Sequence, residues 1–327
     1  MKKIFTIMLV AILLPAFVSC SSQEYPQNYD APTVRIAAMR GPTALGLLQL
    51  MDAAEQDNTI GNYEFTLLGM PDQVPPLLAR GDIDIAAVPS NLAAILHNNP
   101  DIDIQVLAIV TLGVLHIVDT TGEIHSVSDL AGRTIFVSGQ GAMPEFALNY
   151  VLSQNGLTPG VDVNIEFRAE HTEIAAMLEA GIAEIALLPE PFVSTVLARV
   201  EGLRPALDLT EEWNRIQPDY GLIMSVVIGR RSFLEENPAT VTTLLAEYAA
   251  SIEFVTSNIP QAAQLAARFD IIPNAAIAET ALPRTHITFL NGEEMKRNLM
   301  GFYNVLYAQA PQSIGGRLPD ETFFFMD

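Results

Sequence analysis

The chain has 327 residues, of which 50% are apolar and 17% are charged, so it is too long for one ordinary core and is not a disordered protein. Its formal net charge of −21 makes nucleic acid an unfavourable partner, because the phosphates would be repelled. Cys20 is the only cysteine, which excludes an intramolecular disulfide.

The N-terminus reads as a targeting segment. Two lysines precede an apolar run over 4–18, which is short for a membrane span and typical of a signal peptide. The lone Cys20 after this run resembles the lipobox of a bacterial lipoprotein, although Phe17 stands where leucine is usual. We expect a signal peptide at 1–19, lipidation of Cys20 and a polar tether over 20–32; an ordinary secreted protein is the alternative.

Strands and helices alternate in the first part of the chain. Strands are predicted at 34–39, 63–68 and 83–88, and helices at 43–54, 74–79 and 90–97. This alternation predicts an α/β fold with a mostly parallel sheet. The extended stretch that follows, over 104–119, is too long for one strand.

The same alternation then begins again. Strands are predicted at 134–138, 163–167 and 185–188, with helices after "GQGAMPE", at 173–180 and at 192–199. The segments "GDIDIAAVPSN" (81–91) and "GIAEIALLPEP" (181–191) match at an offset of 100, and Gly41 and Gly141 share that offset. The repetition predicts two similar α/β lobes, each with two strand-to-helix turns.

The last part of the chain is less regular. Residues 209–220 are predicted to be irregular, and a strand is predicted at 221–228. Helices follow at 238–256, 260–269, 274–281 and 292–309. The extended segments 104–119 and 219–228 flank the second lobe, so we expect them to be crossovers and hinges.

Open α/β sheets bind ligands outside the carboxyl ends of their strands. Facing lobes would place the turns 40–43, 89–91, 138–143 and 189–191 around one cleft. Glycine allows a sharp turn and proline fits the first position of a helix, which predicts a helix N-terminus beside the ligand. The candidate ligand-binding residues are Arg40, Gly41, Pro42, Thr43, Ser90, Asn91, Thr111, Ser138, Gly139, Gln140, Gly141 and Glu190.

These residues do not decide the charge of the ligand. Two helix N-termini and Arg40 favour an anion, whereas Glu190 favours a donor or a positive charge. Both together would suit a zwitterion or a polar heterocycle. Trp213 and Tyr220 are either packing residues or an aromatic lid, and His116 is expected to be a strand histidine.

Motifs of catalysis and metal binding are missing from the sequence. The five histidines show neither HExxH spacing nor close pairing, and there is no cysteine cluster, so no metal site is expected. There is no GxSxG motif, and "GQGAMPE" lacks the lysine of a phosphate-binding loop. We expect neither a cofactor nor an enzymatic activity.

Longer segments carry a resemblance to a known family. The lipoprotein-like signal, "GPTALGLLQLMD", "DLAGRTIFVSGQGAMPEFALNYVLSQNGL", "IALLPEPFVSTVL" and "FLEENPATVTTLLAEYAASIEFV" resemble substrate-binding proteins of ABC importers. The nearest group binds nitrate, sulfonate, taurine or thiamine-pyrimidine precursors. The resemblance covers nearly the whole chain. It implies a type II periplasmic-binding fold, with lobe 1 at 33–112 plus 225–327 and lobe 2 at 113–224.

The resemblance also implies a function. It is that of a monomeric extracytoplasmic solute-binding protein, anchored in the cell membrane by lipid, that delivers a small polar or anionic solute to an ABC permease. The alternatives are a secreted enzyme on the same fold and a ligand sensor for a signalling partner. Related pyrimidine-precursor synthases carry a cysteine-rich motif that Cys20 alone cannot supply. Related menaquinone enzymes are cytoplasmic, which the signal contradicts.

Overall fold

The computed structural model describes residues 31–326. The predicted signal peptide, Cys20 and most of the predicted tether lie outside the described residues. Within residues 31–326, no helix combines the length and the apolar character needed to cross a bilayer.

Six strands form the first sheet, in the order β11-β4-β10-β3-β1-β2. Its core is parallel, since β1 pairs in the same direction with β2 and β3, whereas β10 runs antiparallel to β3 and β4. The strands are β1 (Thr33–Met39), β2 (Asn62–Leu68), β3 (Ile85–Pro89), β4 (Ile104–Thr111), β10 (Ser225–Arg230) and β11 (Ile287–Leu290).

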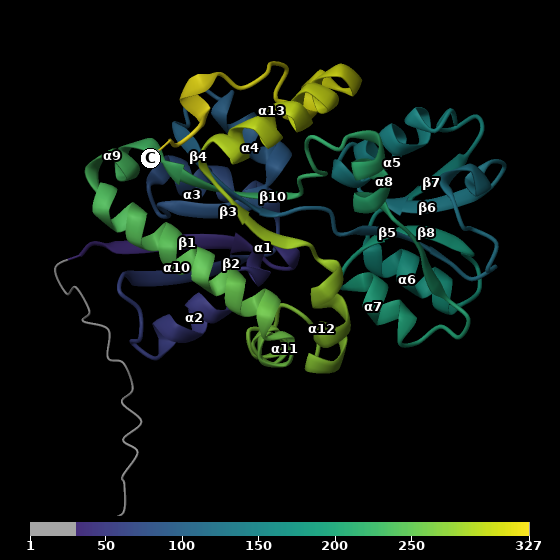
Figure 1. Cartoon of the computed structure of the whole chain (residues 1–327), viewed down its shortest axis with the longest axis horizontal. Helices are drawn as coiled ribbons and strands as arrows, with labels where there is room; N and C mark the ends of the chain where they lie inside the picture. Colours follow the sequence, from purple (N-terminus) through teal and green to yellow (C-terminus); the bar gives the residue numbers. More distant parts are fainter. Residues whose placement is uncertain (1–30, 327) are drawn as a thin grey trace, which may run out of the picture.

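Helices cover both faces of this sheet (Figure 1). Side chains of β1 alternate between the two faces: Ile36 packs into one apolar cluster and Ala37 into the other. One cluster includes α1 (Pro42–Leu45), α2 (Leu48–Glu55), α10 (Pro238–Ser257), α11 (Ile259–Arg268) and α12 (Ala275–Ala281). The other includes α3 (Val74–Arg80), α4 (Ser90–His97) and α13 (Gly292–Gln309).

Five strands form the second sheet, in the order β7-β6-β8-β5-β9. They are β5 (Leu115–Asp119), β6 (Thr134–Ser138), β7 (Asn164–Arg168), β8 (Ile185–Pro189) and β9 (Arg204–Asp208). One face packs on α6 (His171–Glu179) and α7 (Phe192–Leu197), and the other on α5 (Met143–Gln154) and α8 (Leu209–Ile216). We call the two sheets with their helices lobe 1 and lobe 2; they lie side by side in Figure 1.

The internal repeat predicted from the sequence is present in the structure. Lobe 1 contains the strand order β2-β1-β3-β10-β4, and lobe 2 repeats it as β7-β6-β8-β5-β9. Gly81 and Gly181 end equivalent helices with φ of +70° and +67°, a left-handed conformation that glycine adopts without strain. The α/β two-lobed prediction is confirmed, with sheets that are parallel at their cores and mixed at one side.

Three element predictions are wrong. The helix expected at 43–54 is divided into α1 and α2, because the Ser251 hydroxyl donates to the carbonyl of Gly46 between them (2.7 Å). The segment expected to be irregular contains α8, whose start is capped by Asp208 through the N–H of Thr210 (2.7 Å). The strand predicted at 221–228 begins only at Ser225. The short elements β9, α9 (Arg231–Glu236) and β11 were not predicted.

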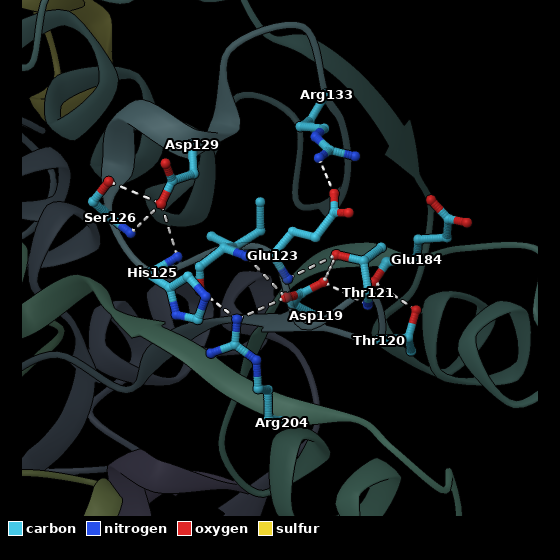
Figure 2. A network of polar contacts seen from close by, with 11 residues as sticks. Asp119, Thr120, Thr121, Glu123, His125, Ser126, Asp129, Arg133, Glu184 and Arg204 are labelled. Carbon is cyan, nitrogen blue, oxygen red and sulfur yellow. Dashed lines mark hydrogen bonds and ion pairs between the residues drawn. The ribbon is translucent and has the colours of Figure 1, made fainter.

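Buried carboxylates stabilise the sheet edges that lie away from the carboxyl ends of β3 and β8. Figure 2 shows one of them: Asp119 is fully buried and accepts hydrogen bonds from Thr121, Ile124 N (3.2 Å) and Arg204 (3.0 Å). Burial alone would raise the pKa of Asp119, but these donors outweigh it and hold the pKa below its usual value. Every acceptor oxygen of this carboxylate is used by the protein, so we assign it a structural role.

Candidate functional site

A cavity of about 620 Å³ lies between the two lobes. Lobe 1 contributes the turn after β1, from Arg40 to Pro42, together with Gly69 after β2. Lobe 2 contributes the start of α6 and the turn 189–192 between β8 and α7. Both lobes therefore present the carboxyl ends of their strands to this space, the usual ligand position in open α/β sheets.

A second cavity, of about 380 Å³, adjoins the first. Both are lined by Pro42, Pro189 and His171, so they are parts of one interlobe cleft. The second part is lined further by Thr43 and Asn91 of lobe 1, by the start of α5 in lobe 2, and by Met224 and Ser225 at the start of β10.

Half of the residues predicted from the sequence line this cleft. They are Arg40, Gly41, Pro42, Thr43, Asn91 and Glu190. The other half do not line either part of it: Ser90, Thr111, Ser138, Gly139, Gln140 and Gly141.

The protein itself uses most of the polar groups that lie away from the cleft. The buried Ser90 hydroxyl donates to the carbonyl of Ile223 (2.6 Å). Thr111 is buried in β4, between its partners in β10 and β11. The N–H of Gly141 donates to Glu145 (2.6 Å), and Gln140 beside it is exposed. Ser90 and Gly141 therefore use these donors within the fold.

Glu190 is completely buried, which sequence reasoning did not anticipate. Its carboxylate accepts from the N–H and the hydroxyl of Ser194, both at 3.0 Å, and Arg284 lies 3.6 Å away. Burial raises the pKa of Glu190 in spite of these contacts. Glu190 thus lines the cleft, while its carboxylate is engaged by Ser194 and lies close to Arg284.

Arg40 is half-exposed and already engaged. Its guanidinium donates to the carbonyl of Asp270 (2.7 Å) and lies 3.4 Å from the carboxylate of the same residue. Thr43 is largely buried, and its hydroxyl forms a hydrogen bond with that of Ser225 (3.2 Å). Both contacts link the turn after β1 to later segments of lobe 1.

His171, the first residue of α6, was missed as a candidate and lines both parts of the cleft. Its Nδ1 forms a hydrogen bond with the hydroxyl of Ser138, and its ring packs on Phe192 with centroids 5.0 Å apart. Burial lowers the pKa of His171 and so favours the neutral form of the ring. The sequence could have indicated this position, because the turns after β2 and β7 also follow parallel strands. They meet the same criterion for a ligand-binding turn as the turns that were selected.

Burial also decides the role of Trp213. Trp213 is fully buried between Tyr150 and Phe302, with ring centroids 4.6 and 5.6 Å away, so it is a core residue and not a lid. Ser138 is 2% exposed, and its hydroxyl is engaged by His171. Among residues 31–326, no three histidine or acidic side chains are grouped closely enough to hold a metal ion.

Comparison with known protein families identifies the family of this chain. The family model described as NMT1/THI5 like matches residues 68–263, which is more than half of the chain. The chain belongs to the NMT1/THI5-like family. No curated protein matches the sequence of this NMT1/THI5-like protein.

Solved structures share the fold at low sequence identity. An ABC transporter protein from Parabacteroides distasonis is 22% identical, with a TM-score of 0.75, and the match covers 89% of this chain and 98% of that one. The aliphatic sulphonate-binding protein SsuA from Escherichia coli is 18% identical (TM-score 0.71; 90% and 93% covered). The nitrate-binding protein NrtA from Synechocystis PCC 6803 is 12% identical (TM-score 0.62; 90% and 84% covered). These likenesses show that the NMT1/THI5-like chain has the fold of type II periplasmic binding proteins.

Proposed function

We propose that this NMT1/THI5-like protein is the extracytoplasmic substrate-binding component of an ABC importer. It captures a small solute between its lobes and delivers it to a permease. The observation that carries the proposal is the cleft, whose walls come from the strand-to-helix turns of both sheets. A solute that contacts both walls favours the closed arrangement of the lobes, which is the state that a permease can recognise.

The names of the structural relatives are consistent with this role. SsuA is described as an aliphatic sulphonate-binding protein and NrtA as a nitrate-binding protein. Their identities to this chain are too low to transfer a ligand. The names of these relatives make sulfonates and nitrate candidate solutes for this chain and do not assign either as its ligand.

The lobe boundaries and the membrane anchor belong to the same proposal. We take 33–112 with 225–327 as lobe 1 and 113–224 as lobe 2, because the chain passes between the sheets after β4 and before β10. A lipid on Cys20 would hold the monomer at the membrane, since two or more acyl chains anchor a protein stably. Labelled palmitate should enter the wild-type protein and not Cys20→Ala.

Native mass spectrometry and small-angle X-ray scattering test the transport role together. Mass spectrometry of the purified protein should show a small molecule that is retained at low activation energy. Scattering should give a smaller radius of gyration with this molecule bound than after its removal. A chemically altered molecule released over time would instead support an enzyme, and an unchanged radius at saturation would contradict capture by closure.

A further inference from the structure

Prolines occupy the helix starts that face the cleft. Pro42 is the first residue of α1, Pro144 is the second residue of α5, and Pro191 directly precedes α7. Proline has no backbone N–H, so each of these helix starts lacks one of the donors with which a helix N-terminus holds an anion. Six prolines at the strand-to-helix turns line the cleft: Pro42, Pro71, Pro89, Pro144, Pro189 and Pro191.

Several of the N–H groups that remain at these turns are used inside the protein. Ser90 donates its N–H to the carbonyl of Met224 (2.9 Å), and Glu190 donates to the carbonyl of Val114 (2.9 Å). The N–H of Ser194 donates to the carboxylate of Glu190 (3.0 Å). These donors are not available to a ligand without breaking a contact of the fold.

The helix start at α6 has no proline, but its charge opposes an anion. His171 and Thr172 of this first turn line the cleft. Glu170 stands at the N-cap, so its carboxylate lies beside the N-terminal dipole, and Glu173 in the first turn lies 3.7 Å from Arg168. A negatively charged ligand would be repelled there.

The cationic side chains of the cleft are already paired. Arg40 and Arg199 are the two that line it, beside the acidic Glu179 and Glu190. Arg199 lies 3.0 Å from the carboxylate of Glu179, and Arg40 is held by Asp270. An anion would have to compete with a carboxylate for either arginine, so the cleft contributes no net positive charge.

We propose that the cleft binds an uncharged small molecule with an apolar body and one polar edge, and not an oxyanion such as nitrate or a sulfonate. This inference rests on the proposed function. Proline rings and Phe192 supply apolar surface for the body. The polar edge is assigned to Nε2 of His171, whose ring is oriented by the contact of Nδ1 with Ser138.

Matched pairs of small molecules test the charge of the ligand directly. Nicotinamide and nicotinate share one ring, as do benzenesulfonamide and benzenesulfonate, and each pair differs in one negative charge. Calorimetry on the purified protein at pH 7.5 should give at least tenfold tighter binding of the neutral member. Equal or tighter binding of the anionic member, or tight binding of nitrate or methanesulfonate, would overturn the proposal.

Substitution of a proline tests the missing donors. Pro144→Ala restores an N–H at the start of α5 and should shift the preference toward the anionic member by roughly tenfold, as expected for one added hydrogen bond to a charged group. Pro238→Ala is the matched control, because Pro238 begins α10 outside the cleft. An identical preference in the two variants would contradict the role of the prolines.

The failure of this inference can be separated from a failure of the proposed function. If an anion binds most tightly and the radius of gyration falls, the protein is still a solute receptor and the ligand class is wrong. If the preferred compound binds without any change in the radius, capture between the lobes fails and this inference fails with it. His171→Ala should weaken the neutral compound at least fivefold, measured at a temperature where its melting curve shows the variant to be folded.

Discussion

Two arginines converge on one buried carboxylate at the start of β3. Asp84 is 1% exposed and lies 2.7 Å from Arg35 and 2.6 Å from Arg230, and it also accepts from the N–H of Arg35 (3.0 Å). Burial alone would raise the pKa of Asp84, but the hydrogen bonds from both arginines outweigh it and lower the pKa. The three residues join β1, β3 and β10 at the edge away from the cleft.

Asp84→Ala should lower the free energy of unfolding by about 2–4 kcal/mol at pH 7, because it removes the partner of two arginines that are only partly exposed. Since the pKa of Asp84 is lower in the folded state, its contribution is complete above about pH 5 and is lost as the pH falls through the folded pKa. Urea unfolding at pH 7 and at a pH well below 5 measures how much of the contribution of Asp84 is lost in acid. Asp82→Ala, which breaks the exposed pair with Arg80, should cost at most about 1 kcal/mol; a similar loss in both variants would contradict the assignment.

His171 predicts a dependence of stability on mild acidity. Burial lowers its pKa, so the unfolded chain binds this proton more readily, and stability falls as the pH drops below about 6.5. His171→Gln should reduce the slope of unfolding free energy against pH between 5 and 6.5 by up to about 1.4 kcal/mol per pH unit. His125→Gln, at an exposed histidine, is the control, and an unchanged slope in His171→Gln would refute the prediction.

Sequence reasoning at the residue scale found the turns but not the direction of each side chain. Gly41, Pro42 and Asn91 were placed at the cleft because strand ends and helix starts can be predicted from the pattern. Ser90 was expected at the same place, yet it is buried and donates to the carbonyl of Ile223, and Glu190 lines the cleft but has its carboxylate buried against Ser194. Such partners are set by the packing of the whole lobe, which a local pattern does not contain.

Among the elements, the crossover between β4 and β5 is packed closely against α8. A Cβ atom at Gly113 would lie 1.9 Å from Oγ1 of Thr210 and 2.9 Å from its Cβ. Glycine is therefore needed at position 113 because there is no room for a side chain. A left-handed backbone is not the reason, since the φ of Gly113 is not positive. The chain passes from one lobe to the other at this contact.

Gly113→Ala should lower the free energy of unfolding by about 1–3 kcal/mol, because the added methyl group must displace α8 or the crossover. Thermal unfolding of the purified variant measures the loss. Gly69→Ala is the matched control, since a Cβ at Gly69 meets no atom within 4 Å and Gly69 has no positive φ. Equal melting temperatures for the two variants would show that the crossover adapts freely.

Long, strongly patterned elements were predicted well and short ones were not. The strands β1, β2 and β6 and the helices α10 and α13 lie where their apolar periodicity placed them. α8 was missed because its run contains two glutamates, an asparagine and an arginine, and only Asp208 and Trp213 indicate a capped, half-buried helix. The four-residue strand β11 depends on pairing with β4, nearly 180 residues earlier.

At the scale of the whole molecule, the segment that leads into β11 ties the two lobes together. Arg284 lies 3.6 Å from the buried Glu190 of lobe 2, and His286 lies 3.0 Å from Asp208, the N-cap of α8. The Nε2 atom of His116 in β5 lies 3.4 Å from the carbonyl of Arg284. These contacts join residues 78 to 168 positions apart, so no pattern along the chain predicts them.

The pair of Arg284 and Glu190 gives a whole-molecule prediction with a defined sign. Burial raises the pKa of Glu190, so the folded state binds this proton more strongly and the cost of ionising the buried carboxylate grows as the pH rises. Removing the positive charge in Arg284→Ala should therefore lower the free energy of unfolding more at pH 8, by about 1–3 kcal/mol, than at pH 5. Urea unfolding at the two pH values measures the difference.

Two further variants separate this pair from a general loss of packing. Glu190→Gln removes the charge, so Arg284→Ala added to it should cost about the same at pH 8 as at pH 5. Arg297→Ala, at an exposed position of α13, should show no dependence on pH from this source. Because Arg284 links the lobes behind Pro189 and Pro191, its loss should also increase the radius of gyration of the ligand-free protein. A loss of stability that is equal at both pH values, or that persists unchanged in the Glu190→Gln background, would show that Arg284 acts through packing and not through Glu190.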